Sequence, residues 1–497
     1  DKDAVPVAEF RQECRDFAAH WLGVQSEEFQ RLGVLGDWQN PYTTMAYAAE
    51  AKIAEELGRI LMDGSLYRGA KPVMWSPVEK TALAEAEIEY EDHTSTTIYA
   101  RFPVTHAAHA ALEGASVIIW TTTPWTMPAN RAVAYGDDIS YQVTEVLAAN
   151  DGALCSKGDV VVIADDLADS VITAIGASET KIRAHVMGRE MAGSVAAHPM
   201  AGHGYDFDVP LLAGSHVTTE QGTGFVHIAP GHGVEDYELA HLKHGIAVPD
   251  TVGEDGVILP HLPVFGGMHV LRDNAKIAEI MAEHKGVIGI GKLVHSYPHS
   301  WRSKAPLIYR NTAQWFVSME SHGLRDIALG ELAKTKFYPA AGQKRLTSMI
   351  AQRPDWCLSR QRAWGVPLTI FAHKQTGEPL RDPAVHARIV EAMKAEGADC
   401  WFMSDSSRFL GDDYNPDDYE KITDILDVWF DSGSTHSFVL EDRDDLESPA
   451  DLYLEGSDQH RGWFHSSLLQ SCATRARAPY KAVLTHGFVL DEQGRKM

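Results

Sequence analysis

Three consecutive threonines, Thr121–Thr123, follow the apolar run Ser116–Ile119 and are stopped by Pro124. Hydroxyl groups and free backbone N–H groups at the end of a strand can hold a polar ligand or position a water molecule. The segment, which continues to Asn130, is therefore a candidate catalytic site. An edge strand that is rich in threonine for its β propensity alone is the alternative, and composition by itself favours it.

A second segment, Gly222–Asp236, joins a strand at Phe225–Ile228 to a glycine- and proline-rich loop and a helix that begins near Val234. His227 lies near the end of the strand, and Asp236 lies in the first turn of the helix. An aspartate in this position is most often a helix cap, and a lone histidine is more often packed than catalytic. An ionised Asp236 that faces a pocket would also suit an ammonium group.

A third polar loop follows the strand Leu452–Leu454 and precedes an apolar helix that begins at Trp463. It brings together Glu455, Asp458 and Gln459 as hydrogen-bond acceptors and donors. The N-terminus of the helix adds positive potential for an anion such as a phosphate. Because parallel α/β sheets bind ligands at the carboxyl ends of their strands, a binding role is favoured here over helix capping.

Two further segments are less informative on their own. Trp429 lies in the segment Asp427–Gly433, where a tryptophan is by default a core residue. Lys496 lies in the final segment Asp491–Met497, which taken alone is only a basic end of the chain.

The elements that position these segments follow from hydrophobic periodicity. Helical spacing predicts a helix over Val7–Trp21, with an apolar face made of Phe10, Cys14, Phe17 and Trp21. A second helix is expected at Met45–Leu61, after Thr43 or Thr44 as caps and before Gly64 as a stop. Lys71–Pro77 is expected to be a strand that enters a linker.

From about Ile88 to Leu293, short β-branched runs alternate with Gly, Pro and Asp turns, which predicts a separate, mostly β domain. The segment His295–Trp301 is interpreted as an irregular return connection, and the charged stretch 371–420 as a solvated surface insertion. Strand, polar loop and helix then alternate as far as the strand Lys481–Leu484, which predicts a parallel sheet. The expected fold class is α/β.

Composition narrows the function classes. The net charge of −25, from 44 basic and 69 acidic residues, by itself disfavours a nucleic-acid partner, although a local basic path stays possible. Five scattered cysteines without a Cys-x-x-Cys pair fit a reducing cytosol and argue against a disulfide framework or a zinc knuckle. No stretch approaches the ~20 apolar residues that span a membrane, so no membrane association is expected.

Taken together, the segments resemble the isoleucyl-tRNA synthetases, a family of class I aminoacyl-tRNA synthetases, from end to end. The further matching motifs are Leu32–Trp38, Gly69–Val73, Ala82–Glu87, Leu358–Gly365 and Gly494–Met497. The number and order of the motifs carry the resemblance. It implies a Rossmann-type catalytic domain, in residues 1–80 and 296–497, that is interrupted by a mostly β inserted editing domain at 81–295.

For the inserted domain, the resemblance implies hydrolysis of mischarged valyl-tRNA. Four residues match the family's threonine-rich editing strand: Thr121, Thr122, Thr123 and Asn130. Asp236 matches the residue that holds the α-ammonium group, and His227 matches the residue that bounds the side-chain pocket and excludes isoleucine. A relative of the valyl enzyme, the alternative, would be expected to carry Thr-Thr-Arg-Pro in the strand and a residue other than histidine at position 227.

For the catalytic domain, Trp429 and Trp463 match the aromatic walls around the isoleucine side chain. Three residues match positions near the aminoacyl-adenylate: Glu455, Asp458 and Gln459. Lys496 matches the first lysine of a mobile loop that contacts ATP. The family's first ATP-binding signature and the rest of that loop are absent from the sequence, so adenylate formation by these residues alone is not expected. Met74–Val78 stands where many relatives carry Cys-x-x-Cys, so no zinc is expected.

The parent enzyme is thus expected to be a monomeric cytoplasmic ligase that joins isoleucine to isoleucine-accepting tRNA with ATP and Mg²⁺. A hydrophobic pocket gains only about 1–3 kcal/mol from one methylene, a figure established on synthetases of this kind, so a second, smaller sieve must remove valine. Without a Ser/Cys–His pair, water is expected to attack the ester directly, with no cofactor. A non-catalytic binding fragment is the other reading of the chain.

Overall fold

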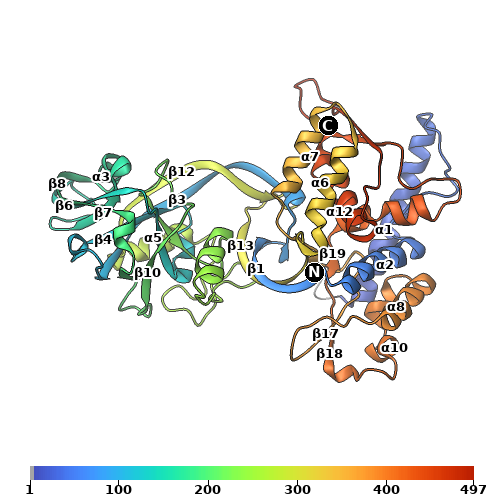
Figure 1. The fold of residues 1–497 in the computed structure, drawn as a ribbon, viewed down its shortest axis with the longest axis horizontal. Helices are drawn as coiled ribbons and strands as arrows, with labels where there is room; N and C mark the ends of the chain where they lie inside the picture. The colour runs from blue at the N-terminus through green and yellow to red at the C-terminus, as the bar shows by residue number, and fades with distance from the viewer. Residues whose placement is uncertain (1–4) are drawn as a thin grey trace. The chain divides into compact units, whose positions relative to one another are not determined.

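The computed structural model describes residues 5–497, which form two compact units (Figure 1). Unit 1 comprises the described residues up to Gly69, Ala84–Ala86 and Ala313–Met497, and unit 2 comprises Ala70–Leu83 and Glu87–Thr312. The chain crosses between the units along β1 (Leu66–Ser76) and β13 (Ile308–Val317). Within residues 5–497, no helix is both long enough and apolar enough to cross a bilayer.

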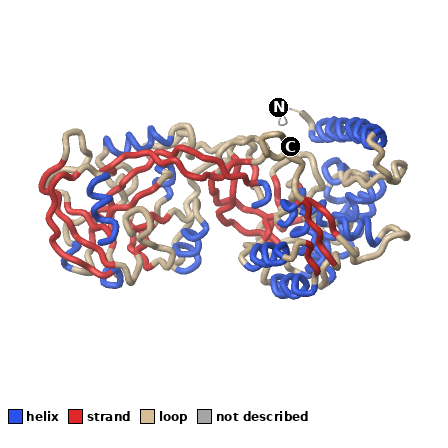
Figure 2. The backbone as a smooth tube through the Cα atoms, turned by 90° about the horizontal axis from the view of Figure 1, so that it is seen from above, coloured by secondary structure: helices blue, strands red, loops and turns tan. Residues whose placement is uncertain are grey.

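Unit 1 is mostly helical, as the blue segments of Figure 2 show. Its longer helices are α1 (Val7–Arg31), α2 (Tyr47–Asp63), α6 (Leu324–Lys334), α7 (Ala341–Ala351), α8 (Pro383–Glu396) and α12 (Trp463–Arg475). Its shorter helices are α9 (Asp399–Met403), α10 (Ser406–Leu410), α11 (Val428–Gly433) and the π-helix η10 (His436–Glu441). Short antiparallel pairs join β15 (Trp356–Cys357) to β13, β16 (Ser359–Arg360) to β19 (Ile425–Leu426), and β17 (Phe371–His373) to β18 (Tyr419–Lys421).

A parallel sheet in unit 1 carries the third polar loop. Its strands lie in the order β14 (Lys336–Tyr338), β21 (Ala482–His486) and β20 (Tyr453–Gly456), and both pairs are parallel. Strand β20 runs into the loop that precedes α12, as the alternation of strand, loop and helix predicted. The α/β fold class with a parallel sheet is therefore confirmed.

The first two helices are confirmed, but their details differ from the prediction. Gly64 ends α2 with a left-handed φ of 87°, as expected, whereas the N-cap of α2 is Ala46 rather than a threonine. In α1, Phe17 is 66% exposed and the buried residue is Arg11. The guanidinium of Arg11 donates to the carbonyls of Ala363 and Gly365 and pairs with Asp399. Polar anchoring of α1 thus replaces the apolar face that periodicity predicted.

The interpretation of residues 371–420 as a solvated insertion is wrong. Strands β17 and β18 close this stretch, and α8 and α9 lie between them. Trp401 is fully buried and donates from Nε1 to the carbonyl of Ile422 at 2.8 Å, and Phe371 and Phe409 pack against its ring. The charged residues occupy the outer face, while apolar residues spaced along the helices join the core of unit 1.

Unit 2 is built on one large sheet (strands red in Figure 2). Its strands are β3 (Ile88–His106), β4 (Ser116–Thr121), β5 (Ala132–Tyr135), β6 (Ser140–Ala149), β7 (Val160–Ala164), β8 (Ala177–Met187), β9 (Val195–Ala197), β10 (Asp208–Ala213), β11 (Phe225–Ile228) and β12 (Val287–Ser300). Their order is β11-β5-β10-β9-β3-β4-β7-β6-β8, and β12 pairs with β3. Outside this sheet, β2 (Thr81–Ala82) pairs with the end of β1, and the helices are α3 (Ala168–Ala174), α4 (Val234–Tyr237) and α5 (Asn274–Glu283).

The segment His295–Trp301 is not an irregular connection, because it continues β12 as far as Ser300. His295 pairs with His93, and Ser300 pairs with Ile88, in one uninterrupted antiparallel ladder. From position 292 to 297 burial alternates between half-buried and exposed, as in a strand with one covered face. Pro298 and the unusual histidine content obscured this alternation in the sequence.

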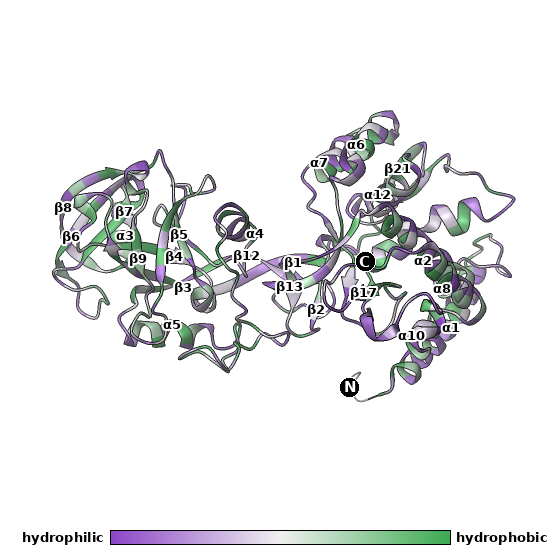
Figure 3. Cartoon of the chain, turned by 60° about the horizontal axis from the view of Figure 1, so that its bottom comes forward, coloured by the Kyte–Doolittle hydropathy of each residue, from purple (hydrophilic) through white to green (hydrophobic). Residues whose placement is uncertain are grey.

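The strand that ends in the threonines is held by an apolar core. Ile118 of β4 is buried against Val161 and Ile163 of β7, and Val171 of α3 completes the same cluster. The hydropathy colouring of Figure 3 shows β7 as a hydrophobic strand. A buried and fixed β4 places the residues after Thr121 at a defined position on the rim of the sheet.

Candidate functional site

The threonine run forms a folded corner at the end of β4. The backbone N–H of Thr123 donates to Thr121 Oγ1 at 3.1 Å, and the two hydroxyl oxygens are also 3.1 Å apart. A 3₁₀ turn, Pro124–Ala129, starts directly afterwards. Thr122 is half-buried, and its hydroxyl makes no side-chain hydrogen bond with any described residue. Thr121 and Thr123 therefore shape the corner, and the Thr122 hydroxyl keeps its hydrogen-bonding capacity for a ligand or a water molecule.

His227 of β11 is held at both ring nitrogens. Asn130 Nδ2 lies 3.0 Å from His227 Nδ1 and also donates to the carbonyl of Ala132 at 2.9 Å. Thr126 Oγ1 lies 2.8 Å from His227 Nε2. Strand pairing brings the two segments together, because His227 pairs with Val133 across β11 and β5. The structure thus joins predicted site residues from two distant segments.

The His227 ring is uncharged. Burial, with smaller contributions from His198 and His232, lowers its pKa to about 3. Its side chain is also only 8% exposed. An uncharged, immobile imidazole is suited to bounding a pocket for an apolar side chain.

Asp236 lies in α4, in the first turn after the glycine-rich loop. Its Oδ2 accepts a hydrogen bond from the backbone N–H of Ala229 at 2.7 Å, so the carboxylate also fixes the chain just after β11. A Cβ atom at Gly233 would lie 2.9 Å from the Asp236 carboxyl carbon, so glycine is needed for this approach.

The charge of Asp236 differs from the sequence-based expectation. Burial raises its pKa to about 7, helped by the neighbouring Glu235 and opposed by the Ala229 N–H. Near neutral pH the free protein therefore holds this side chain as a mixture of acid and carboxylate. A cationic ligand beside it would favour the carboxylate.

A packed histidine links the same loops. His232 Nδ1 donates to the carbonyl of Tyr309 and Nε2 accepts from Thr251 Oγ1, both at 2.8 Å, and its ring packs edge-on against Trp125 at 4.9 Å. This agrees with the prior expectation for lone histidines. Sequence reasoning did not identify Thr126 as a partner of His227, because the two residues are separated by 101 positions.

A cavity of about 500 Å³ lies beside Trp120, the residue before the threonine corner, and its lining does not include the threonines, His227 or Asp236. It is lined by residues that include Tyr99, Trp120, Glu220 and Lys292. Trp120 directly precedes Thr121, so the cavity begins at the same end of β4. Its lining offers aromatic faces, one cation and one carboxylate.

The predicted aromatic walls lie in unit 1. Trp463 stacks on Tyr453 with ring centroids 3.9 Å apart, and its Nε1 donates to the Ser432 carbonyl at 3.0 Å. The backbone N–H of Trp463 donates to Gln459 Oε1 at 2.9 Å. A Cβ atom at Gly462 would lie 2.5 Å from both Gln459 Oε1 and Trp429 Cη2. Gln459, Trp463 and Trp429 therefore form one compact group.

The charged residues of this region are exposed. Lys496 Nζ pairs with Asp458 Oδ2 at 3.3 Å and lies 4.1 Å from the centre of the Phe488 ring. Glu455 is the last residue but one of β20, pairs in register with Thr485 and points into solvent-accessible space. The structure brings Lys496 to Asp458, which follows the carboxyl end of β20. Among the described residues, no cluster of three His, Cys, Asp or Glu side chains has the arrangement of a metal site.

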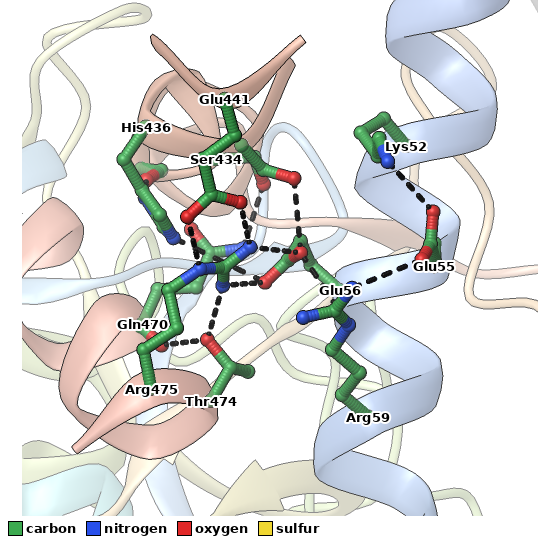
Figure 4. Close-up of polar contacts among 12 residues, drawn as sticks. Lys52, Glu55, Glu56, Arg59, Ser434, His436, Glu441, Gln470, Thr474 and Arg475 are labelled. Atoms are coloured by element: carbon green, nitrogen blue, oxygen red, sulfur yellow. Dashed lines mark hydrogen bonds and ion pairs between the residues drawn. The ribbon is translucent and has the colours of Figure 1, made fainter. Parts of the chain in front are cut away.

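A buried ion cluster holds the helices behind this site (Figure 4). Arg475 of α12 donates to both carboxylate oxygens of Glu56 on α2, at 2.6 and 2.9 Å, and to both oxygens of Glu441 on η10. Glu56 is fully buried. The cluster fixes α12, which begins at Trp463, against α2 and the helix that follows Trp429.

Comparison with known proteins gives consistent relatives. The sequence model described as tRNA synthetases class I (I, L, M and V) matches residues 1–497. Isoleucine–tRNA ligase of Pelagibacter ubique is 54% identical over 497 residues, which cover 100% of this chain and 54% of the relative. Isoleucine–tRNA ligase of Gluconobacter oxydans is 53% identical over 512 residues, which cover 100% of this chain and 53% of the relative. The chain thus spans about half the length of these curated relatives.

Among the solved structures that match, one aligns with nearly the whole of this chain. It is the LeuRS–tRNA–LeuAMS ternary complex of Agrobacterium radiobacter K84, with a TM-score of 0.36 and 14% sequence identity, covering 99% of this chain and 59% of that chain.

Proposed function

Because the chain belongs to the class I tRNA synthetases of the isoleucine, leucine, methionine and valine group, we propose that unit 2 hydrolyses valyl-tRNA as the editing part of an isoleucine–tRNA ligase. The observation that carries the proposal is the clamped, uncharged His227 beside the threonine corner, with Asp236 tied to the end of the same strand. This set offers a side-chain wall, a hydroxyl for water and an anion for the α-ammonium group.

The mechanism follows from these groups. Asp236, as the carboxylate, pairs with the α-ammonium group and so orients the ester. The Thr122 hydroxyl positions a water molecule against the ester carbonyl. Water adds to the carbonyl carbon, the bond to the ribose oxygen breaks, and the products are free valine and a tRNA with both ribose hydroxyls. The wall formed by His227 excludes isoleucine, and the aromatic faces of Trp120 and Tyr99 are available to stack the terminal base.

The central experiment measures release of valine from valyl-tRNA by the purified chain, with isoleucyl-tRNA as the second substrate. Release of valine with sparing of isoleucine is the expected result. A chain that binds mischarged tRNA but releases no valine would instead support the alternative of a non-catalytic binding fragment.

The deacylation rate is expected to depend on pH through Asp236. Since burial raises the pKa of this carboxyl to about 7, kcat/KM for valyl-tRNA rises by about tenfold per unit below pH 7. It falls again at higher pH, where the α-ammonium group of the substrate, with an ordinary pKa of about 7.7–8.0, loses its proton. The profile is measured after subtraction of uncatalysed ester hydrolysis. Asp236→Asn removes the rising limb, and a flat wild-type profile would contradict the assignment.

The stability of the fold should change with pH in the opposite sense to the rising limb of the deacylation rate, so that it falls as the pH rises. A carboxyl whose pKa is raised from 3.8 to about 7 in the fold stabilises the protein below pH 3.8, and this contribution is lost as pH rises through 7. Asp236→Asn, which keeps an acceptor for the Ala229 N–H, is therefore expected to unfold at a higher temperature than the wild type at pH 8.

For unit 1, we propose that Trp429 and Trp463 form the walls of the isoleucine site and that Glu455, Asp458 and Gln459 lie beside the aminoacyl-adenylate. Of the predicted residues only Lys496 is cationic, and one lysine does not complete a triphosphate site. In the whole protein, the proposed partners are isoleucine, ATP with Mg²⁺, and isoleucine-accepting tRNA. The five free cysteines fit a reducing compartment, and we propose a monomeric, cytoplasmic enzyme.

Gly462→Ala tests the synthetic site. The added Cβ would lie 2.5 Å from Trp429 Cη2 and from Gln459 Oε1, so the wall or the amide must move. We expect affinity for a non-hydrolysable isoleucyl-adenylate analogue to fall by about tenfold or more, measured by fluorescence titration. Gly330→Ala, where a Cβ meets nothing within 4 Å, is the control. Equal affinity in the two variants would contradict the assignment of Trp429 and Gln459 to the binding site.

A further inference from the structure

Thr126 contacts His227 on the side opposite Asn130, and it has no role in the mechanism above. Thr126 lies in the 3₁₀ turn after the threonine corner and is only 4% exposed. Its Oγ1 lies 2.8 Å from the carbonyl oxygen of Thr123 and 2.8 Å from His227 Nε2. A third neighbour, Thr123 Oγ1, lies 3.3 Å away and carries a proton of its own. The single hydroxyl proton of Thr126 therefore serves one of the first two contacts.

The chemistry of the neighbours decides where the protons are. A carbonyl oxygen can only accept, so the Thr126 hydroxyl donates to Thr123, and His227 Nε2 must then be the N–H that donates to Thr126. Asn130 gives the same answer independently. Its Nδ2 is fixed by donation to the Ala132 carbonyl, and its second hydrogen points to His227 Nδ1, which must therefore accept. Both sides of the ring specify the Nε2–H tautomer.

This arrangement also excludes one role for His227. Both ring nitrogens are engaged by protein groups at 2.8 and 3.0 Å. The ring therefore has no nitrogen left to take a proton from an attacking water. His227 acts through the position of its ring, and that position depends on its two partners.

We propose that Thr126 is a positioning residue that sets the specificity of the hydrolytic site, by locking the His227 ring in one tautomer and one orientation so that its body blocks the extra methylene of isoleucine. The proposal rests on the proposed function of unit 2. With Thr126 in place, the ring cannot tilt without breaking a buried hydrogen bond on each side. Without the hydroxyl, only the Asn130 contact remains, and the ring can turn away from the pocket.

The test compares Thr126→Val with Thr126→Ser in the full chain. Valine keeps the shape and loses the hydroxyl, and serine keeps the hydroxyl. For Thr126→Val we expect kcat/KM for isoleucyl-tRNA deacylation to rise by about tenfold, within the range that one methylene controls, while the value for valyl-tRNA stays within about threefold of the wild type. Thr126→Ser should retain the selectivity of the wild type.

A matched control separates specificity from packing. Thr144 of β6 is another fully buried threonine with a side-chain hydrogen bond, from Gln142 at 2.8 Å. Thr144→Val should leave the ratio of the two deacylation rates unchanged. An unchanged ratio in Thr126→Val, or a parallel loss of both activities, would overturn the proposal.

A spectroscopic readout works without any activity. The ¹⁵N chemical shifts of the His227 ring report its tautomer, and the wild type should show Nε2–H, because Asn130 Nδ2 can only donate to Nδ1. A wild type that shows Nδ1–H overturns the inference even if the chain hydrolyses valyl-tRNA. Failure of the wild type to release valine would instead overturn the proposed function.

Discussion

Asp236→Ala is expected to lower kcat/KM for deacylation of valyl-tRNA by roughly 100-fold or more. Truncating one partner of a buried, hydrogen-bonded charge pair typically costs about 2–5 kcal/mol, and each 1.4 kcal/mol is about tenfold. Here the variant removes the anion for the α-ammonium group and also the acceptor for the Ala229 N–H. Both losses act at the end of β11, directly beside His227.

Two companion variants separate the loss of the charge from the loss of the hydrogen-bond acceptor. Asp236→Asn keeps an oxygen for the Ala229 N–H and loses only the charge, so it isolates the contribution of the ion pair. Glu235→Ala removes the neighbouring exposed carboxylate on the same turn and should retain most of the activity. The assignment of Asp236 fails if Asp236→Asn deacylates valyl-tRNA as fast as the wild type.

Arg475→Ala should have the largest effect on stability, because it leaves the fully buried carboxylate of Glu56 without its main partner. Breaking such a pair from one side costs about 3–5 kcal/mol of unfolding free energy. Although burial raises the pKa of Glu56, the hydrogen bonds and charge of Arg475 hold it below the usual value. The stabilisation is therefore present above the pKa of the unfolded side chain and is lost as pH falls through the folded pKa.

Urea denaturation at neutral and acidic pH checks this result. Lys394→Ala is the control, since Lys394 pairs with Glu391 on the surface of α8 with both side chains more than half exposed. Such a pair contributes no more than about 1 kcal/mol. If Arg475→Ala and the control destabilise the chain equally, the buried cluster does not hold α2, η10 and α12 together.

The sequence was informative where short-range patterns determine structure. The apolar run before Thr121, the strand that contains His227 and the strand–loop–helix unit around Gln459 all lie where the sequence pattern predicts them. The partnership of Thr126 and His227 could not be predicted, because it depends on the register of β11 against β5. The raised pKa of Asp236 depends in the same way on burial, which the primary sequence does not display.

Two errors have a common physical origin. In α1 and in residues 371–420, the polar or apolar character of the segment is a poor guide to the exposure of its residues. Arg11 is buried because carbonyl oxygens and Asp399 satisfy its guanidinium. Trp401 is buried although acidic residues surround it in the sequence. Which residues are covered depends on tertiary partners far away in the chain, and composition alone does not reveal them.

The burial of the Asp236 carboxyl alters how its pocket would respond to its surroundings. Below about pH 7 the side chain carries a proton, and an arriving ammonium group would displace it, so one cation is exchanged for another. The occupied and the vacant pocket then have equal net charge. Capture of the amino acid moiety should therefore be nearly insensitive to ionic strength, and its measured heat should vary with the protonation enthalpy of the buffer.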